Sequence, residues 1–415
     1  MLTGYRLGGR YDRKIEMNTN AKLTRNAKAL IAVHLLYNVA ALFLNTFFIS
    51  FVMRNVQNEI EAISVLTLSW FIIQIIAFFA LVGKLKTGNK INVFRLSVLP
   101  SAICCLMIIG LGSEVVHWVI PMGILLGMRD ALHWLPMHTM AGEVVAKESM
   151  TKFTSYRTMM TGITRVVAPV LLGFFITIES YESVAGALLV VCALDFLCIS
   201  LLKPPKKRVK KSGPDFAGLY RSIKRTPLIR KLFLIEVLNG ISMFGALSTV
   251  ITMYTVYLFK TDLNLGIFTT VFAMSAILTN YVFGKFGQPR MFPPILVVST
   301  IGLCCSLLLF VFAVSEATFI LYNLVSSIAI TLISSITMIN VYNVSKKSCV
   351  KDKHKIEYFT LREAMLTIGR MIAFGGLLLI GIYGGYEWLR WYLVFLIMSV
   401  VAIGYLSIKI NRYIK

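Results

Sequence analysis

The sequence predicts an all-α integral membrane protein with twelve transmembrane helices, arranged as two six-helix pseudo-repeats. Three observations lead to this prediction. First, the 415 residues are 57% hydrophobic and only 15% charged, whereas about a quarter of the residues of a soluble domain are charged. Second, apolar runs of about 20 residues, the length that crosses a bilayer core, recur along the chain. Third, the basic residues gather in segments between alternate runs.

The apolar runs predict two bundles joined by a basic linker. The first six lie near 29–52, 62–83, 92–112, 115–140, 153–177 and 183–202, and make up an N-terminal bundle over 29–202. The second six lie near 229–258, 264–284, 292–314, 317–342, 358–382 and 388–408, and make up a C-terminal bundle over 229–408. Cytoplasmic tails are expected at 1–28 and 409–415, and the linker at 203–228. Within the linker, residues 216–225 form either an amphipathic helix on the inner leaflet or a solvated segment.

The net charge of +23 is explained by membrane topology. Segments on one side of the predicted membrane hold 34 Lys and Arg, whereas the opposite loops hold only Arg54, Lys260 and Arg390. By the positive-inside rule, both termini are cytoplasmic in a multi-pass protein of the cell (plasma) membrane. No nucleic-acid partner is expected. Six of the seven cysteines lie inside apolar runs, so no disulfide framework is expected. No CxxC pattern occurs, so no metal site is expected either, and no cofactor is predicted.

The two halves of the sequence repeat one another. Arg157 and Arg165 are eight residues apart in the fifth predicted helix, and Arg362 and Arg370 have the same spacing in the eleventh. A repeated six-helix unit is typical of secondary transporters, whose substrate site lies between the repeats.

Intramembrane arginines are the costliest residues of the chain. A charge at the centre of a membrane helix costs at least about 2.5–3.5 kcal/mol, so it normally faces a protein interior or a watery cavity. Arg165 and Arg370 fall near the midplane, which predicts an electropositive substrate cavity. Alternatively, they join helices through ion pairs and carbonyl contacts. Arg157 and Arg362 lie nearer the cytoplasmic end and are predicted to act in gating.

The fourth predicted helix carries a group of titratable residues. Arg129, Asp130 and His133 share one side of that helix because residues three and four apart are neighbours. A buried carboxylate beside these groups can titrate near neutral pH, which proton coupling requires. The alternative is a structural ion pair. Glu236 in the seventh helix, standing alone with Asn239, is the second candidate for carrying the proton.

Other polar residues inside helices are candidates for the cavity lining. His34 and Asn38 in the first helix are the approximate counterparts of Glu236 and Asn239, and Ser334 belongs to a tenth helix rich in small polar side chains. Such residues either allow close helix packing or line a wet pathway. For Asp195, an interhelical contact is expected.

Several motifs resemble those of the major facilitator superfamily. Leu126 and Arg129 match its fourth-helix Leu-x-x-Arg motif, which the family associates with proton coupling. The loop containing Gly83, Gly88 and Lys90 is similar to the family's gating motif, although Leu85 stands at the acidic position. The antiporter motif of the fifth helix is matched only by Ala168-Pro169 and Gly173.

The resemblance implies a secondary active transporter and not an enzyme. A proton-coupled antiporter for efflux of a small amphipathic or anionic solute is the expected function, and a flippase or exporter of lipids or anionic headgroups is the alternative. The expected partners are this small-molecule or lipid substrate, H⁺ as the coupling ion, and membrane lipids around a monomer. The substrate and the coupling ion are not specified by the sequence.

Overall fold

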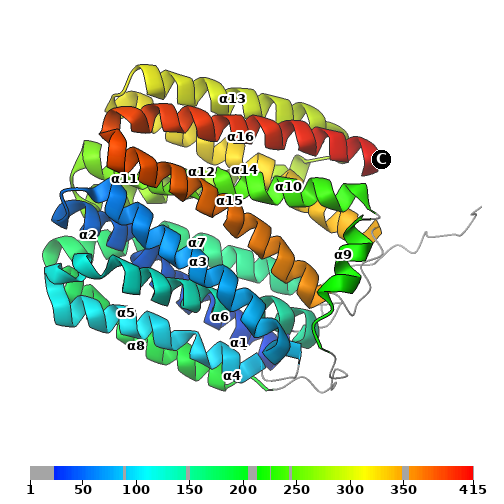
Figure 1. Cartoon of the computed structure of the whole chain (residues 1–415), viewed down its shortest axis with the longest axis horizontal. Helices are drawn as coiled ribbons and strands as arrows, with labels where there is room; N and C mark the ends of the chain where they lie inside the picture. Colours follow the sequence, from blue (N-terminus) through cyan, green and yellow to red (C-terminus); the bar gives the residue numbers. More distant parts are fainter. Residues whose placement is uncertain are drawn as a thin grey trace, which may run out of the picture.

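The computed structural model describes residues 23–86, 90–145, 150–203, 213–224, 226–242, 245–347 and 355–414. These residues are almost entirely helical, and most of the helices run side by side along one direction (Figure 1). The predicted all-α class is therefore confirmed.

The first half contains eight α-helices and two short helical segments of other types. They are α1 (Arg25–Leu42), the π-helical turn η1 (Phe43–Phe47), α2 (Phe48–Asn55), α3 (Glu59–Lys86), α4 (Lys90–Leu96), α5 (Val98–Leu111), the 3-10 segment η2 (Gly112–Trp118), α6 (Val119–Val144), α7 (Met150–Ile178) and α8 (Tyr181–Ser200).

The second half contains a further eight α-helices in the described chain. They are α9 (Phe216–Lys224), α10 (Pro227–Ile241), α11 (Ala246–Phe259), α12 (Asp262–Phe286), α13 (Phe292–Phe312), α14 (Glu316–Lys347), α15 (Lys355–Tyr383) and α16 (Gly385–Ile414), with the short 3-10 segment η4 (Pro289–Met291) before α13.

Eleven helical segments of the described chain are long and apolar enough to cross a membrane. One of them, Lys90–Ala141, has 52 residues, or about 78 Å of helix, more than twice a bilayer core of about 30 Å. This segment turns back at Gly112, whose φ is 53°, and α5 then packs beside α6. It contains the third and fourth predicted spans, so the prediction of twelve transmembrane helices is confirmed.

The two halves meet along two seams, one between α3 and α15 and the other between α7 and α12. Glycines allow close backbone approach in both. A side chain at Gly381 would collide with the backbone of Glu61, and one at Gly266 would collide with the carbonyl of Pro169. In Figure 1, α15 (orange) runs beside the blue helices of the first half.

The start of α1, the linker and the end of α16 lie at one end of the molecule, here called the linker end. The Asn26 side chain donates to the carbonyl of Lys203 at 2.9 Å and accepts from the Lys203 amide at 3.1 Å, and both α9 and the end of α16 lie at the right of Figure 1. The opposite end is called the far end. Because the start of α1 and the end of α16 lie at the same end, the described helices between them cross an even number of times.

The helix considered for residues 216–225 is present as α9. Its apolar residues Leu219 and Ile223 are buried, and α9 contacts α10 and α15. Phe216 also packs against Phe79 of α3, with ring centroids 5.5 Å apart. The apolar side of α9 therefore faces other helices of the protein and bridges the two halves at the linker end.

Candidate functional site

A buried ion pair occupies the middle of the first half. Arg129 is 0% exposed and Asp130 is 6% exposed. The Arg129 guanidinium donates to Asp130 Oδ1 from Nε at 2.8 Å and from Nη2 at 2.7 Å. The Tyr37 hydroxyl donates to the same carboxylate at 2.7 Å and the Trp70 indole at 3.2 Å. The Asp130 carboxylate is thus held by donors from three helices, which offsets the cost of removing both charges from water.

Arg129 also binds to the irregular turn of the first crossing. Its Nη2 donates to Asn45 Oδ1 at 3.0 Å, and its guanidinium carbon lies 5.5 Å from the Tyr37 ring centroid and 5.4 Å from that of Trp70. Both distances are within cation–π range. Asn45 belongs to η1, where the Phe48 amide donates to the carbonyl of Phe43, five residues earlier. Arg129 therefore connects α6 to α1, η1 and α3.

His133 lies against Tyr37 without a hydrogen bond. The two rings are stacked with centroids 3.5 Å apart, and neither nitrogen of the buried His133 has a hydrogen-bond partner. His34 Nε2 lies 3.1 Å from Thr161 Oγ1 and links α1 to α7. The structure thus brings Arg129, Asp130 and His133 together through Tyr37, a residue that sequence reasoning did not identify.

The second half contains a different buried ion pair. Arg362 Nε donates to Glu236 Oε1 at 2.8 Å, and Arg362 Nη1 donates to Glu363 at 3.1 Å. The expectation that Glu236 stands alone with Asn239 is therefore wrong, because its partner comes from α15, 126 residues later in the chain. Asn239 is buried one turn along α10. The Oε2 atom of Glu236 has no hydrogen-bond partner among the described residues.

Arg165 lies halfway along α7 on the side that faces the protein. At 100° per residue, it lies about 40° from Thr161, which contacts α1, and about 40° from Pro169, whose carbonyl contacts Gly266 of α12. Arg165 is nevertheless solvent-exposed, and no carboxylate of the described chain forms an ion pair with it. Arg165 therefore carries an exposed guanidinium at mid-length of α7, on the side of this helix that packs against α1 and α12.

Arg370 occupies the matching position of α15. It is half-buried, and its guanidinium carbon lies 5.3 Å from the Phe71 ring centroid of α3. It is also within electrostatic range of Asp130 and Glu236. Arg370 therefore lies between the two buried ion pairs, one in each half.

The remaining predicted site residues are dispersed. Asn38 and Ser334 donate to carbonyls of their own helices, at 2.6 Å to His34 and 3.1 Å to Thr331. Gly83 lies at the linker end of α3, and the buried Lys90 lies at the start of α4. Arg157 lies two turns before Arg165 on α7. Gly88 is outside the described residues. Within the described chain, no group of three or more His, Cys, Asp or Glu side chains is placed to hold a metal ion.

Sequence reasoning missed a contact between the halves at the linker end. Lys86 of α3 forms an ion pair with Glu357 of α15, and both side chains are buried. Glu357 also accepts from the Asp215 amide at 2.9 Å, and Lys86 donates to the carbonyl of Gly213 at 3.1 Å. The segment that leads into α9 is thus attached to both halves.

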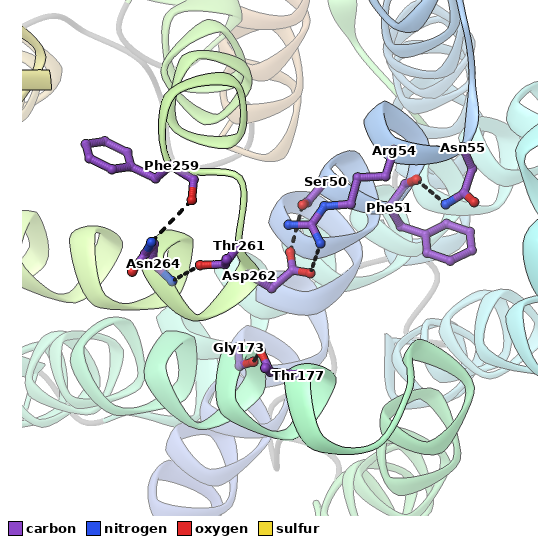
Figure 2. A network of polar contacts seen from close by, with 10 residues as sticks. All are labelled: Ser50, Phe51, Arg54, Asn55, Gly173, Thr177, Phe259, Thr261, Asp262 and Asn264. Carbon is purple, nitrogen blue, oxygen red and sulfur yellow. Dashed lines mark hydrogen bonds and ion pairs between the residues drawn. The ribbon is translucent and has the colours of Figure 1, made fainter. Parts of the chain in front are cut away.

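A second such contact lies at the far end, where the first crossing meets the start of α12 (Figure 2). Arg54 Nη1 lies 2.9 Å from Asp262 Oδ2, and the Ser50 hydroxyl donates to Asp262 Oδ1 at 2.7 Å. The backbone of Asp262 also lies against Gly173 of α7. These contacts hold the far ends of α2, α7 and α12 together.

Loss of the Asp262 carboxylate is expected to loosen the far end. Asp262 is 3% exposed and Arg54 is 35% exposed, so Asp262→Asn removes a largely desolvated pairing, an effect of about 1–3 kcal/mol. Electron spin resonance between nitroxides at Asn55→Cys and Lys260→Cys, in a cysteine-free background, should show longer and broader distances. Glu316→Gln, an exposed carboxylate at the same end, is the control. An unchanged distance distribution in Asp262→Asn would show that the ion pair does not hold this end closed.

Comparisons with known proteins agree with this architecture. The family model "Major Facilitator Superfamily" matches residues 30–349. The uncharacterized protein YqgE of Bacillus subtilis (strain 168) is 21% identical over 350 residues, which cover 83% of this chain and 80% of that protein.

Two solved structures share the fold at low sequence identity. A bacterial homologue of the iron transporter ferroportin, in an inward-facing state, aligns with a TM-score of 0.68 and 15% identity, over 94% of this chain and 100% of that one. A D-xylose–proton symporter aligns with a TM-score of 0.65 and 11% identity, over 92% of this chain and 96% of that one. With its transmembrane helices and the family match over most of its length, the chain belongs to the Major Facilitator Superfamily and is a multi-pass membrane protein of the secondary-transporter class.

Proposed function

We propose that this transporter exports a small anionic or amphipathic solute across the cell membrane in exchange for protons. The observation that carries the proposal is the solvent-exposed Arg165 at mid-length of α7, with no carboxylate partner in the described chain. A guanidinium without a counter-charge at this depth is costly. An anionic substrate group at Arg165 would offset that cost, because guanidinium binds carboxylate and phosphate in bidentate fashion.

Arg370 supports the same assignment from the opposite half. Its stacking on Phe71 places a cation beside an apolar ring, a combination that suits a solute with a charged group and a hydrophobic body. Arg165 and Arg370 come from the repeated helices α7 and α15, so a solute bound between them would contact both halves. His34, Asn38, Asn239 and Ser334 remain proposed as further residues of the cavity.

The proposed proton coupling uses the buried ion pair of Arg129 and Asp130. Protonation of Asp130 would remove the charge that holds Arg129 and would leave its guanidinium held by Asn45 alone among its described hydrogen-bond partners. His133 and Glu236 remain the other candidates for this step. The structural similarity to a D-xylose–proton symporter is compatible with a proton gradient as the driving force. Gating at the linker end is assigned to Arg157, Arg362 and the Gly83–Lys90 loop, with both termini in the cytoplasm.

The test is transport in liposomes with anionic, zwitterionic, neutral and cationic fluorescent probes under an imposed pH gradient. Arg165→Gln should reduce anion transport at least tenfold, the equivalent of about 1.4 kcal/mol, whereas Arg165→Lys should retain more of it. Arg290→Gln, which removes an exposed arginine of the η4 segment, should transport normally. Full anion transport by Arg165→Gln, or a wild type that carries only cations, would refute the proposal.

A lipid-like substrate is the second candidate, and one groove favours it. The groove has a volume of about 480 Å³ and lies between α1, α7 and α8, and its lining is almost entirely apolar, including Leu35, Val167 and Leu188. Its apolar lining would accept an acyl chain while the headgroup reaches toward Arg165 of the same α7. Movement of fluorescent anionic lipids between leaflets of the same liposomes distinguishes this function from export of a soluble solute.

A further inference from the structure

A third carboxylate lies inside the first half, apart from the two ion pairs. Asp195 of α8 is 6% exposed, and its Oδ1 atom has no hydrogen-bond partner among the described residues. No Lys, Arg or His of the described chain forms an ion pair with it. The described ion pairs therefore leave the Asp195 carboxylate without a counter-charge, and its expected interhelical contact remains a prediction. A buried carboxylate requires a counter-charge or a proton, because an isolated ion in a low dielectric costs many kcal/mol.

Asp195 lines a small enclosed cavity between α1, α5 and α8. The cavity has a volume of about 10 Å³, which is about the space of one water molecule or one small ion. Three of its lining residues carry hydroxyl groups, namely Tyr37, Ser97 and Ser101, and the rest of the lining is mainly apolar.

Two of these hydroxyl groups already donate their protons in hydrogen bonds to other groups. The Tyr37 hydroxyl donates to Asp130 at 2.7 Å, and the Ser97 hydroxyl donates to the carbonyl of Phe94 at 2.6 Å. A hydroxyl has one proton and two lone pairs, and an ionised carboxylate has lone pairs only. Tyr37, Ser97 and Asp195 can therefore offer only lone pairs to an occupant of the cavity.

We propose that Asp195, Ser97, Ser101 and Tyr37 bind one dehydrated Na⁺. Oxygen ligands with free lone pairs are those that hard cations prefer. The single carboxylate neutralises one positive charge, since Asp130 is already balanced by Arg129. A divalent ion would leave an uncompensated buried charge, and the cavity volume excludes an ion that keeps its hydration shell.

The proposed Na⁺ site lies next to the Arg129–Asp130 ion pair. Binding of Na⁺ does not require this ion pair to take part in proton coupling. Tyr37 is shared, because it is a lining residue of the cavity and its hydroxyl donates to Asp130. Bound Na⁺ would fix the Tyr37 ring, on which His133 is stacked. Na⁺ binding requires no particular transported solute, so it can be tested on the purified protein without a substrate.

The experiment is thermal unfolding of the purified full-length chain at a fixed, mildly alkaline pH. NaCl, LiCl, KCl and choline chloride are compared at equal ionic strength. A ligand that binds only the folded state stabilises it as its concentration exceeds Kd. We expect a saturable rise in Tm of several degrees (order of magnitude) with NaCl relative to choline chloride. This rise should disappear in Asp195→Asn, shrink in Ser101→Ala and persist in Glu179→Gln, which removes an exposed carboxylate directly after α7.

Three outcomes would overturn the Na⁺ site. One is an equal wild-type Tm in NaCl and choline chloride, which would indicate a protonated Asp195. Another is a Na⁺-dependent rise that survives in Asp195→Asn, which would place the ion elsewhere. The third is a Tm that rises equally in NaCl, LiCl and KCl, as expected of a general salt effect and not of a site for one dehydrated Na⁺. Because no solute is present, none of these outcomes bears on anion export, and failure of anion export would leave the Na⁺ result intact.

Discussion

Asp130→Asn and Arg129→Ala are each expected to abolish transport against a concentration gradient. Asp130→Asn replaces the group that accepts from Arg129, Tyr37 and Trp70 with an amide that cannot be protonated at physiological pH. Arg129→Ala leaves a carboxylate that is 6% exposed without its counter-charge, which costs about 3–5 kcal/mol. Both changes would remove the proposed link between protonation of Asp130 and the position of the Arg129 guanidinium.

The measurement is accumulation of an anionic probe in liposomes with an imposed pH gradient, at equal amounts of inserted protein. Both variants should lose the accumulation that a protonophore abolishes in the wild type, and Asp130→Asn should still allow downhill exchange. The double variant Arg129→Gln/Asp130→Asn, which leaves no unpaired charge, is the control for folding. Normal uphill transport by Asp130→Asn would exclude it as the coupling carboxylate.

Gly127→Val is expected to prevent correct assembly of the first half. A side chain at Gly127 would overlap the carbonyl of Trp70, and one at Gly123 would overlap that of Leu66. The two glycines, four residues apart, thus let α6 lie directly against α3, as small residues do between membrane helices. Overpacking of a core typically costs about 1–3 kcal/mol, and a collision with backbone belongs at the upper end because no rotamer change relieves it.

The expected result for Gly127→Val is aggregation, or a much lower Tm in fluorescence-detected thermal unfolding with size-exclusion chromatography. The matched control is Gly186→Val in α8, because a side chain at Gly186 meets no atom within 4 Å. If Gly127→Val were as stable and monodisperse as Gly186→Val, close approach of α6 and α3 would not be required.

The fold could be predicted because lipid imposes a simple pattern on the chain. Each crossing requires a long apolar run, and the number of crossings follows directly. The ends of helices could not be predicted as well, because hydropathy marks the limit of lipid and not of the helix. The tenth and twelfth predicted spans illustrate this: α14 continues to Lys347 and α16 to Ile414, beyond the runs ending near 342 and 408.

The chemistry of the site was only partly predictable. Arg129 and Asp130 are neighbours in sequence, so their pairing could be expected. Tyr37 and Trp70 could not, because an aromatic residue on an apolar helix gives no sign of which neighbouring helix it faces. The pairing of Glu236 with Arg362 was missed for the same reason, since it depends on how α10 packs against α15.

The two contacts between halves were missed for another reason. Arg54 and Lys86 were counted as indicators of topology, and a charge at the end of a helix fits that role equally well when it is paired across the two halves. Only the packing shows that Arg54 meets Asp262 and Lys86 meets Glu357.

The π-helical turn η1 determines how far α2 is rotated about the helix axis relative to α1. One extra residue in a helix turns everything beyond it by about 100°. Asn45 in this turn reaches Arg129, and Ser50 and Arg54 beyond it reach Asp262. Deleting Leu44 would restore ordinary helical register and rotate α2 relative to α1, so that Asn45 and Arg54 could no longer reach both partners at once. Conversion of η1 to regular helix would therefore break the contacts of α2 with Asp262 at the far end through rotation of α2 alone. No other membrane-spanning helix would have to change its length.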